Sequence, residues 1–208
     1  MARQTTTRPS AACSEAAHDE QLTELARQGD VSAFGRLVER HKNRVLNTCW
    51  RICGNRDDAE DLAQEAFMKA LEAISSFQAR SQFYTWLCRI AVNVSLSHVR
   101  RQARAPKLSL HDREGRLRTE HQAAKLVNRV SADGQGPADK LCVRQTEQQL
   151  LAALARLDED HRAIVVLRDI EGLDYQEISS VLEINIGTVK SRLHRARMEL
   201  RAILRPIV

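Results

Sequence analysis

Apolar residues recur at helical spacing from about residue 19 to residue 104. The first recurring positions are Leu22, Leu25, Phe34, Leu37, Val38, Val45, Leu46, Cys49 and Ile52. Residues three or four apart lie on one face of a helix, so the pattern predicts amphipathic helices with one buried side. Gly29-Asp30 interrupts the first helix and Gly54-Asn55 ends the next. Because almost nothing here alternates with the period of a strand, residues 19–104 are predicted to form an all-helical unit.

A second helical block is predicted over residues 140–208. Its first apolar positions at helical spacing are Leu150, Leu151, Leu154, Leu157, Ile164, Val165 and Leu167. Two shorter helices follow them. The fold class is therefore all-α, with two small helical domains.

The segment between the blocks, residues 105–139, is rich in proline, glycine and charge and has only isolated apolar residues. Such a segment cannot bury enough apolar surface to offset its chain entropy. We expect a flexible linker that leaves the two domains independent in the free protein. Residues 1–18 are polar and are expected to form a disordered tail.

The last two predicted helices have the pattern of a helix-turn-helix. Asp174 can cap the first of them, and Glu177, three residues later, completes a capping box. Ile178 and Val181 give this helix a buried side. A tight turn follows, and Asn185 is the expected N-cap of the second helix.

The second helix, residues 186–200, has one apolar stripe and one cationic side. The stripe consists of Val189, Leu193, Ala196 and Leu200. Opposite it project Gly187, Thr188, Ser191, His194 and Arg195, with Lys190, Arg192 and Arg197 on the flanks. A membrane-surface helix would need a wider apolar face with aromatic anchors, and a solvated helix would mix charges, yet residues 186–198 contain no acid. A DNA major groove fits best, because Arg195 can reach base edges while flanking cations meet phosphates.

Composition adds charge and compartment to this picture. The 208 residues carry a formal net charge of +5, which suits an acidic partner, although a solvated basic surface would give the same balance. No apolar run approaches the length of a membrane span. The N-terminal segment lacks the hydrophobic core of a secretory signal, so we expect a cytoplasmic protein.

The five cysteines fit a reducing compartment, because their number is odd and none forms a C-x-x-C pair. Cys49 and Cys53 lie one helical turn apart, and His41 lies two turns earlier. A metal or redox pair there is the alternative to core packing. Since a structural zinc site needs four ligands and buried free cysteine is common, core packing is favoured and no metal or other cofactor is expected.

A polar loop followed by a basic helix occupies residues 75–104. Trp86 lies one turn before Ile90 and is most simply a core residue. A polar loop beside Phe83, Tyr84 and a basic helix is also what single-stranded DNA binding requires. Unpaired bases stack on aromatic rings, and their phosphates attract cations.

Both blocks together resemble the extracytoplasmic-function (ECF) group of bacterial sigma factors, within the sigma-70 family. The stretch "LDEDHRAIVVLRDIEGLDYQEISSVLEINIGTVKSRLHRARMELR" is similar to region 4 of that group, and "GTVKSRLHRAR" is close to a signature for it. The stretches "DAEDLAQEAF" and "FYTWLCRIAVN" resemble region 2. No segment resembles the middle domain of housekeeping sigma factors, as expected for the ECF group.

The resemblance implies a fold and a function. Residues 19–104 would form sigma region 2, and residues 140–208 would form sigma region 4 with its helix-turn-helix. Members of the group bind core RNA polymerase, recognise the −35 and −10 elements of promoters and assist promoter opening. They are initiation factors without catalytic activity, so no catalytic residue is expected, and an anti-sigma factor is a common partner in the family.

The resemblance also implies three sets of site residues. Residues expected at the −35 element are Lys190, Ser191, Arg192 and Arg195, with Thr188, His194 and Arg162 beside them. Residues expected to capture the −10 strand are Arg80, Ser81, Asn93, His98, Arg100 and Arg101. The polymerase would meet Asp61, Gln64 and Glu65, although an acidic helix start also favours the helix dipole in any protein. Phe67 and Leu71 are expected in the core.

Two positions depart from the family pattern. Asp158 stands where proline usually follows leucine, and Asn185-Ile186 stands where proline often precedes the glycine. Both departures affect a predicted helix start.

Two other classes of protein are the alternatives. A stand-alone helix-turn-helix regulator would explain residues 175–197 but would leave the acidic helix without a role. An enzyme with a nucleic-acid-binding appendage would need a catalytic motif. The sequence has no P-loop, dinucleotide-binding glycines or nucleophile elbow, and its histidines are scattered.

Overall fold

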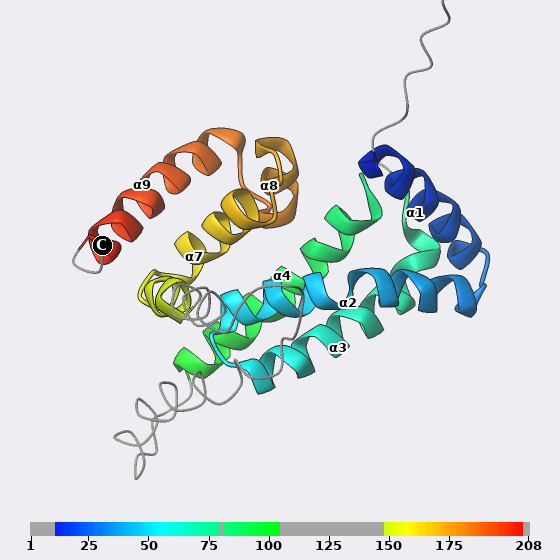
Figure 1. The fold of residues 1–208 in the computed structure, drawn as a ribbon, viewed down its shortest axis with the longest axis horizontal. Helices are drawn as coiled ribbons and strands as arrows, with labels where there is room; N and C mark the ends of the chain where they lie inside the picture. Colours follow the sequence, from blue (N-terminus) through cyan, green and yellow to red (C-terminus); the bar gives the residue numbers. More distant parts are fainter. Residues whose placement is uncertain (1–10, 80, 105–147, 206–208) are drawn as a thin grey trace, which may run out of the picture.

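The computed structural model describes residues 11–79, 81–104 and 148–205, with side chains from residue 18 onward. All regular secondary structure in these ranges is helical, which confirms the all-α prediction. The N-terminal unit contains α1 (Ala11–Arg27), α2 (Val31–Cys53), α3 (Arg56–Ala73), the short 3₁₀ helix η1 (Ile74–Ser76) and α4 (Phe83–Arg104). The C-terminal unit contains a helical segment over residues 148–155, then α7 (Glu159–Val165), the π-helical turn η3 (Val166–Ile170), α8 (Tyr175–Leu182) and α9 (Ile186–Leu204) (Figure 1). Among the helices of these ranges, none has the length and apolar character that a membrane crossing requires.

Helix α1 begins at Ala11, inside the segment that the sequence analysis assigns to a tail. The apolar periodicity used to predict helices starts only at Leu22, which is buried. The preceding stretch is rich in alanine, the residue with the highest helix propensity, so it extends the helix without the apolar periodicity. The expected linker, residues 105–139, lies outside the described residues.

Capping residues end and start the helices where the sequence predicts breaks. The side chain of Asp30 accepts hydrogen bonds from the backbone N–H groups of Ser32 and Ala33, at 2.8 and 3.1 Å. Gly54 adopts the left-handed conformation, with φ of 80°, and its N–H closes the last turn of α2. Such caps satisfy backbone groups that a helix end otherwise leaves unpaired.

The two positions that depart from the family pattern still start helices. Asp158 is the N-cap of α7, and its Oδ1 accepts from the N–H of Asp160 at 3.0 Å. The aspartate therefore starts the helix by a capping hydrogen bond, whereas a proline would favour a helix start through its fixed φ angle. Helix α9 begins at Ile186, directly after Asn185.

Helices α2, α3 and α4 pack side by side as the main bundle of the N-terminal unit, and α1 covers one end of α2 (Figure 1). Their facing sides are lined with small and branched residues. The most deeply buried are Leu37, Val45, Cys49, Ile52, Ala59, Ala66, Ala70, Leu87, Ala91 and Val92. Several alanines on α3 allow close approach of α2 and α4, so a small unit still reaches dense packing.

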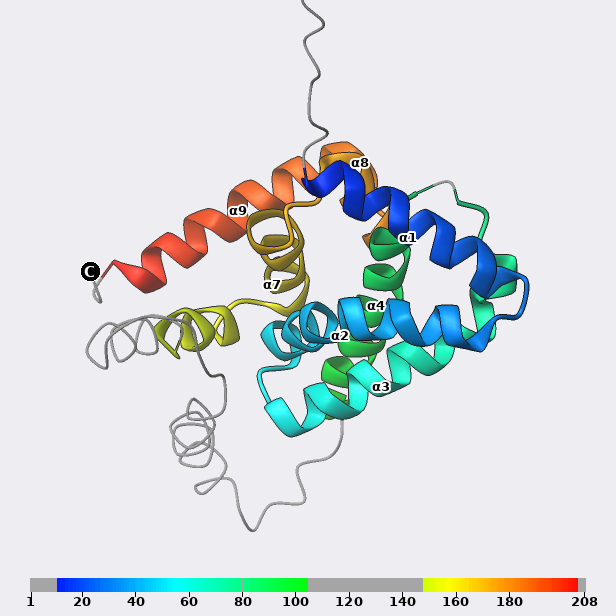
Figure 2. The ribbon, with the colours of Figure 1, turned by 45° about the vertical axis from the view of Figure 1, so that its right-hand side comes forward.

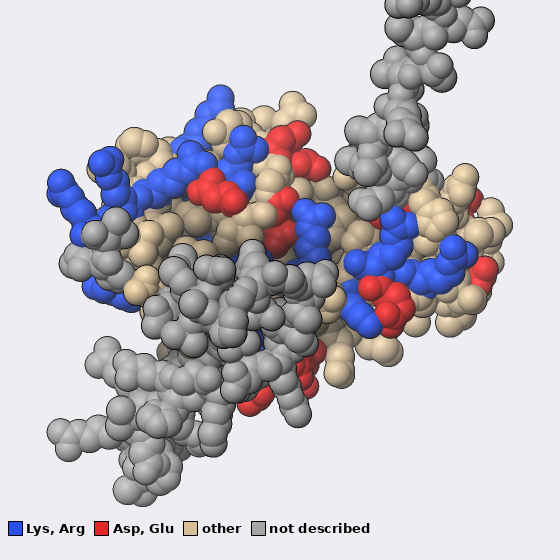
Figure 3. Space-filling model, viewed as in Figure 1, with Lys and Arg blue, Asp and Glu red and all other residues tan. Residues whose placement is uncertain are grey.

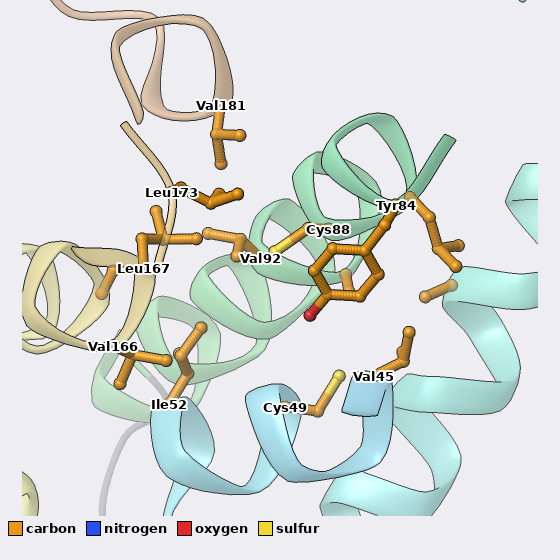
Figure 4. Close-up of a cluster of buried hydrophobic side chains, with 14 of the residues drawn as sticks. Val45, Cys49, Ile52, Tyr84, Cys88, Val92, Val166, Leu167, Leu173 and Val181 are labelled. Carbon is orange, nitrogen blue, oxygen red and sulfur yellow. The ribbon is translucent and has the colours of Figure 1, made fainter. Parts of the chain in front are cut away.

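The two units share one continuous apolar core. Helix α4 packs against α8 and α7, and α2 packs against α7 and η3. Figure 4 shows Val166, Leu167 and Leu173 of the C-terminal unit facing Ile52 and Val92 of the N-terminal unit. The structure thus places the two units in contact, whereas the sequence analysis expects them to be independent in the free protein. Periodicity reports which face of a helix is buried, but not whether the covering surface belongs to the same unit.

Three cysteines have described side chains, Cys49, Cys53 and Cys88, and they lie in this core, as the favoured interpretation predicts for Cys49 and Cys53. Cys49 and Cys88 are fully buried and Cys53 is partly buried. Burial raises the pKa of the Cys49 thiol to about 11 and that of the Cys88 thiol to about 12. The nucleophilic thiolate is thus scarce at neutral pH while the core is closed.

We expect Val189→Asp to unfold the C-terminal unit. Val189 is completely buried in the stripe of α9, and an unpaired carboxylate there should lower the free energy of unfolding by about 4 kcal/mol or more. Met198→Asp, at a position of the same helix that is 55% exposed, should change it by less than about 0.5 kcal/mol. Urea denaturation followed by circular dichroism measures both variants. Equal stability of the two would contradict the assignment of the buried stripe.

Candidate nucleic-acid and polymerase interfaces

The capping box predicted for the first helix of the helix-turn-helix is present. Asp174 Oδ1 accepts from the backbone N–H groups of Gln176 and Glu177, at 2.7 and 2.8 Å. The Glu177 carboxylate accepts from the Asp174 N–H at 2.8 Å. These reciprocal bonds fix the start of α8, and Ile178 and Val181 are buried as predicted.

The turn between α8 and α9 is closed differently from the prediction. Asn185 occupies the N-cap position of α9, but its side chain makes no capping hydrogen bond. Ser179 of α8 instead donates its hydroxyl to the carbonyl of Ile184 at 2.5 Å. Glu183 turns the chain in the left-handed conformation, with φ of 54°. The hydroxyl of Ser179 is therefore the side chain that fixes this turn.

Helix α9 presents the two sides that its sequence predicts. Val189, Leu193 and Ala196 are buried against the rest of the unit. On the other side Lys190, Ser191, His194, Arg195 and Arg197 are exposed, while Thr188 and Arg192 are partly buried. Figure 3 shows lysine and arginine side chains gathered over α9. Figures 1 and 2 place this helix on the far side of α7 and α8 from α3, so its cationic face points away from the main bundle.

Two arginines of α9 are held by aspartates. Arg197 pairs with Asp169 of η3 through two hydrogen bonds, one of them with Nε 3.0 Å from Oδ2. Arg192 Nη1 lies 3.1 Å from Asp160 Oδ2. Arg195 forms no ion pair with any residue of the described ranges. Arg195 is thus the arginine of this face that is best placed to meet a ligand, whereas the charge of Arg197 is already compensated.

Arg162 is placed differently from the other residues expected at the −35 element. Its guanidinium donates to three backbone carbonyls, those of Ile52, Ala155 and Leu157, at 2.6, 3.0 and 3.0 Å. Ile52 belongs to the N-terminal unit, so Arg162 ties the two units together. A contact between Arg162 and DNA would require these bonds to break.

The acidic face of α3 is open. Asp61, Gln64 and Glu65 are all exposed on one side of the helix. Glu65 forms an ion pair with Lys69 one turn later, at 2.7 Å, but such a solvated pair exchanges readily for another cation. Phe67 packs partly buried against the core as expected, whereas Leu71 is 37% exposed and does not serve the core.

A hollow of about 450 Å³ lies between α3 and α4 and brings two of the predicted residue sets together. Its polar lining comprises Glu65 and Lys69 from α3 and Asn93, Ser97, His98 and Arg101 from α4. His98 is also 3.4 Å from the Asp58 carboxylate. Three candidates for −10 strand capture, Asn93, His98 and Arg101, therefore line the same hollow as Glu65, a candidate for polymerase binding.

The remaining −10 candidates are scattered. Ser81 is exposed, and Arg80 lies outside the described residues. Arg100 pairs with Asp160 of the C-terminal unit, with Nη2 2.7 Å from Oδ1. Phe83 and Tyr84 are 5% and 6% exposed; the Phe83 ring packs with Phe77 and Trp86, and the Tyr84 ring lies 5.5 Å from the His41 ring. These two rings are core residues here and offer no face for base stacking.

Sequence reasoning misses a buried polar network centred on Glu171. Its carboxylate accepts from Tyr84 Oη at 2.6 Å, Thr48 Oγ1 at 2.8 Å and Arg44 Nε at 2.9 Å. Each of these partners lies 87 or more positions from Glu171 along the chain, so no local spacing connects them to it. The one local signal is an acid followed by glycine between apolar residues, which reads equally well as a surface turn.

Comparison with known families gives two matches. Residues 37–105 match sigma-70 region 2, and residues 147–200 match sigma-70 region 4. The first match contains α3, α4 and the hollow between them. The second contains the helix-turn-helix.

Curated relatives match nearly the whole chain. The RNA polymerase sigma-H factor of Pseudomonas aeruginosa is 34% identical over 91% of this chain and 95% of its own. The ECF RNA polymerase sigma-E factor of Escherichia coli K12 is 33% identical over 94% and 98%. The ECF RNA polymerase sigma factor SigW of Bacillus subtilis is 33% identical over 87% and 94%.

Solved structures show the same fold. CnrH, in complex with the cytosolic domain of CnrY, is 25% identical and covers 91% of this chain and 98% of its own, with a TM-score of 0.63. The sigma factor RpoE of Bartonella quintana, in complex with the anti-sigma factor NepR, is 24% identical and covers 84% and 98%, with a TM-score of 0.60. The helical architecture therefore has experimental counterparts.

We expect Asp174→Ala to lower the free energy of unfolding by about 1 kcal/mol, because it removes the acceptor for two N–H groups at the start of α8. Asp174→Asn keeps an acceptor oxygen and should cost less than half as much. Chemical denaturation of the two variants and the parent chain measures the difference. An alanine variant as stable as the parent would show that the capping box contributes nothing.

Proposed function

The chain belongs to the sigma-70 family, in its ECF group, and from this premise we propose how its surfaces divide the work of a sigma factor. Such a factor binds core RNA polymerase, directs it to promoters with particular −35 and −10 elements and assists promoter opening. We assign polymerase docking to α3, −35 recognition to α9 and −10 strand capture to α4. The N-terminal unit then acts as region 2 and the C-terminal unit as region 4.

The observation that carries the proposal is the outward face of α9. It is exposed and cationic, and it contains no acid from residue 186 to residue 198. The capping box and the Ser179 hydroxyl hold the helix at a fixed angle to α8, as a helix in a major groove requires. Arg195 is exposed and carries the strongest base-reading potential, because arginine makes paired hydrogen bonds to guanine. Lys190 and Ser191 lie beside it, with Thr188 and His194 at the margins.

The hollow between α3 and α4 supports strand capture by α4. Asn93, His98 and Arg101 line it together, and they supply amide, imidazole and guanidinium donors for the acceptors of a base or phosphate. Ser81 stands exposed before α4, and Arg80 precedes it in the sequence. The rings of Phe83 and Tyr84 remain in the core, so polar contacts rather than stacking would hold the strand.

The open acidic face of α3 supports polymerase docking. Asp61, Gln64 and Glu65 together form a row of acceptors for cationic side chains of core polymerase. The hydrophobic contacts of this helix point the other way, into the bundle. The row is therefore available to a partner without any change in the fold of the unit.

The proposed role also implies a regulatory partner, a cellular compartment and the absence of a catalytic activity. We propose an anti-sigma factor as a regulatory partner, because solved relatives of the same fold are complexes with such proteins or with the cytosolic domain of a second protein. The chain would work in the cytoplasm with RNA polymerase and would have no catalytic activity of its own. The stand-alone regulator is not favoured, because it gives no role to the region 2 match.

Reversing the charge of the α3 row should weaken polymerase binding. We expect Asp61→Lys with Glu65→Lys to reduce affinity for core RNA polymerase by about tenfold or more, because exposed acids would become cations facing cations. The matched control is Glu20→Lys with Glu39→Lys, the same change of charge at exposed positions of α1 and α2. Affinity is measured with purified core enzyme by fluorescence anisotropy. Equal losses in the two double variants would refute docking by α3.

Arg195 and Arg197 should respond differently to truncation. We expect Arg195→Ala to relax the preference for one base pair of the −35 element, at a cost of about 1–3 kcal/mol of discrimination. Arg197→Ala should leave the selected sequence unchanged, because Arg197 is already paired with Asp169. The measurement is selection of run-off transcripts from a randomised −35 library by holoenzyme assembled with each full-length variant. If neither variant alters the selected sequence, α9 is a non-specific basic surface.

A further inference from the structure

Asp160 binds one arginine from each of the two proposed DNA-binding sets. Its Oδ1 is 2.7 Å from Arg100 of α4, and its Oδ2 is 3.1 Å from Arg192 of α9. Arg100 belongs to the set proposed for the −10 element and Arg192 to the set proposed for the −35 element. The two guanidinium groups are thus held by the two oxygens of one carboxylate.

Promoter geometry excludes this arrangement on DNA. The −35 and −10 elements lie about 25 base pairs apart, which at about 3.4 Å per step is about 85 Å of duplex. Two arginines that share one carboxylate cannot contact both elements at once. The units must therefore separate before both elements are bound.

A buried carboxylate holds the units together. Glu171 follows η3 in the C-terminal unit, and its side chain is only 3% exposed. It enters a socket of the N-terminal unit formed by Arg44, Thr48 and Tyr84, and its charge is further compensated by Arg51, whose Nη1 is 3.7 Å away. Arg44 also donates Nη2 to the backbone carbonyl of Glu171 at 2.9 Å. Every strong partner of this carboxylate comes from the other unit.

The cation and the hydroxyl of the socket also contact each other's side chains. The Arg44 guanidinium stacks on the Tyr84 ring, 3.6 Å from its centroid, so cation and hydroxyl are oriented together. On the other side, the π-helical turn η3 ends at Ile170, and Gly172, two residues later, has a φ of 76°, a conformation that glycine adopts readily. That turn projects Glu171 toward the socket while Leu173 packs in the shared core.

We propose that this arrangement is a closed, inhibitory state of the sigma factor, latched by Glu171 in the Arg44–Thr48–Tyr84 socket. In the closed state Asp160 occupies Arg100 and Arg192, and the carbonyl of Ile52 occupies Arg162. The acidic row of α3 stays exposed, so polymerase can dock while the DNA contacts are still engaged within the chain. Opening withdraws Glu171 from the socket, separates Arg100 from Asp160 and frees Arg162 from the carbonyl of Ile52, whereas Arg192 and Asp160 stay together within the C-terminal unit. The inhibitory role rests on the proposed function, whereas the latch itself does not.

Cys88 provides a native reporter of opening. Its thiol is 1% exposed on α4 and lies near Tyr84 and Glu171, and Figure 4 shows it beside Val92, which faces Leu167 and Leu173. Separation of the units uncovers this position. Alkylation by iodoacetamide in the full-length chain, with the modified peptide assigned by mass spectrometry, then measures the rate of opening without DNA or polymerase.

The primary variant is Glu171→Gln, which keeps the size of the side chain but removes the charge that faces Arg44 and Arg51. Tyr84→Phe loosens the same latch from the other unit by removing one donor. The matched control is Glu183→Gln. Glu183 also bridges the units through an ion pair with Arg89, but its side chain is 68% exposed, and such pairs contribute little.

We expect Glu171→Gln to speed Cys88 alkylation about tenfold or more, Tyr84→Phe to speed it severalfold, and Glu183→Gln to change it less than twofold. Affinity of the free chain for a single-stranded oligonucleotide carrying a −10 element should rise in the same order, because opening frees Arg100 of the proposed −10 set from Asp160. Unchanged alkylation in both latch variants, with helicity retained, overturns the latch. If Glu171→Gln loses the circular dichroism signal of its helices, that variant is unfolded, and the alkylation rate of Tyr84→Phe alone tests the latch.

Faster alkylation without a gain in DNA affinity overturns inhibition and leaves the latch standing. Failure of the proposed function would show elsewhere, as parent holoenzyme that selects no −35 sequence or does not depend on the α3 row for assembly. The two failures are therefore distinguishable. The alkylation rates report on the contact between the units in either case.

Discussion

The arrangement of the whole molecule depends on burying one carboxylate. An ionised side chain removed from water is very unfavourable unless hydrogen bonds and opposite charge replace its hydration. Glu171 finds those replacements only across the boundary between the two units, in Arg44, Thr48 and Tyr84. The apolar contacts around it could slide, because they are non-directional. The hydrogen bonds cannot, so they select one orientation of the C-terminal unit on the N-terminal unit.

The same orientation decides which charged residues face solvent. It leaves the acidic row of α3 and the outer side of α9 open, while it commits Arg100 to Asp160 and Arg162 to the carbonyl of Ile52. Residues with similar side chains and similar expected roles therefore differ in availability. For Arg100 the difference comes from the contact between the units, whereas Arg192 and Arg197 are paired with aspartates of their own unit.

The sequence predicts helices, breaks and exposed faces well, because these depend on residues close together in the chain. The capping box at Asp174, the left-handed Gly54 and the buried stripe through Val189 are all local patterns. Three features could not be predicted. The start of α1 lacks apolar periodicity, the turn before α9 uses Ser179 rather than Asn185, and the Glu171 network joins residues far apart in the chain. Burial of Phe83 and Tyr84 belongs to the last class, since it depends on what covers α4.

The hollow between α3 and α4 is shared by two proposed functions, polymerase docking and −10 strand capture. Glu65 from the proposed docking row and Asn93, His98 and Arg101 from the proposed strand-capture set line the same space. A substitution that retunes promoter choice from within this space also changes the surroundings of a docking residue. Diversification of −10 preference is consequently constrained by the need to keep binding an unchanged polymerase.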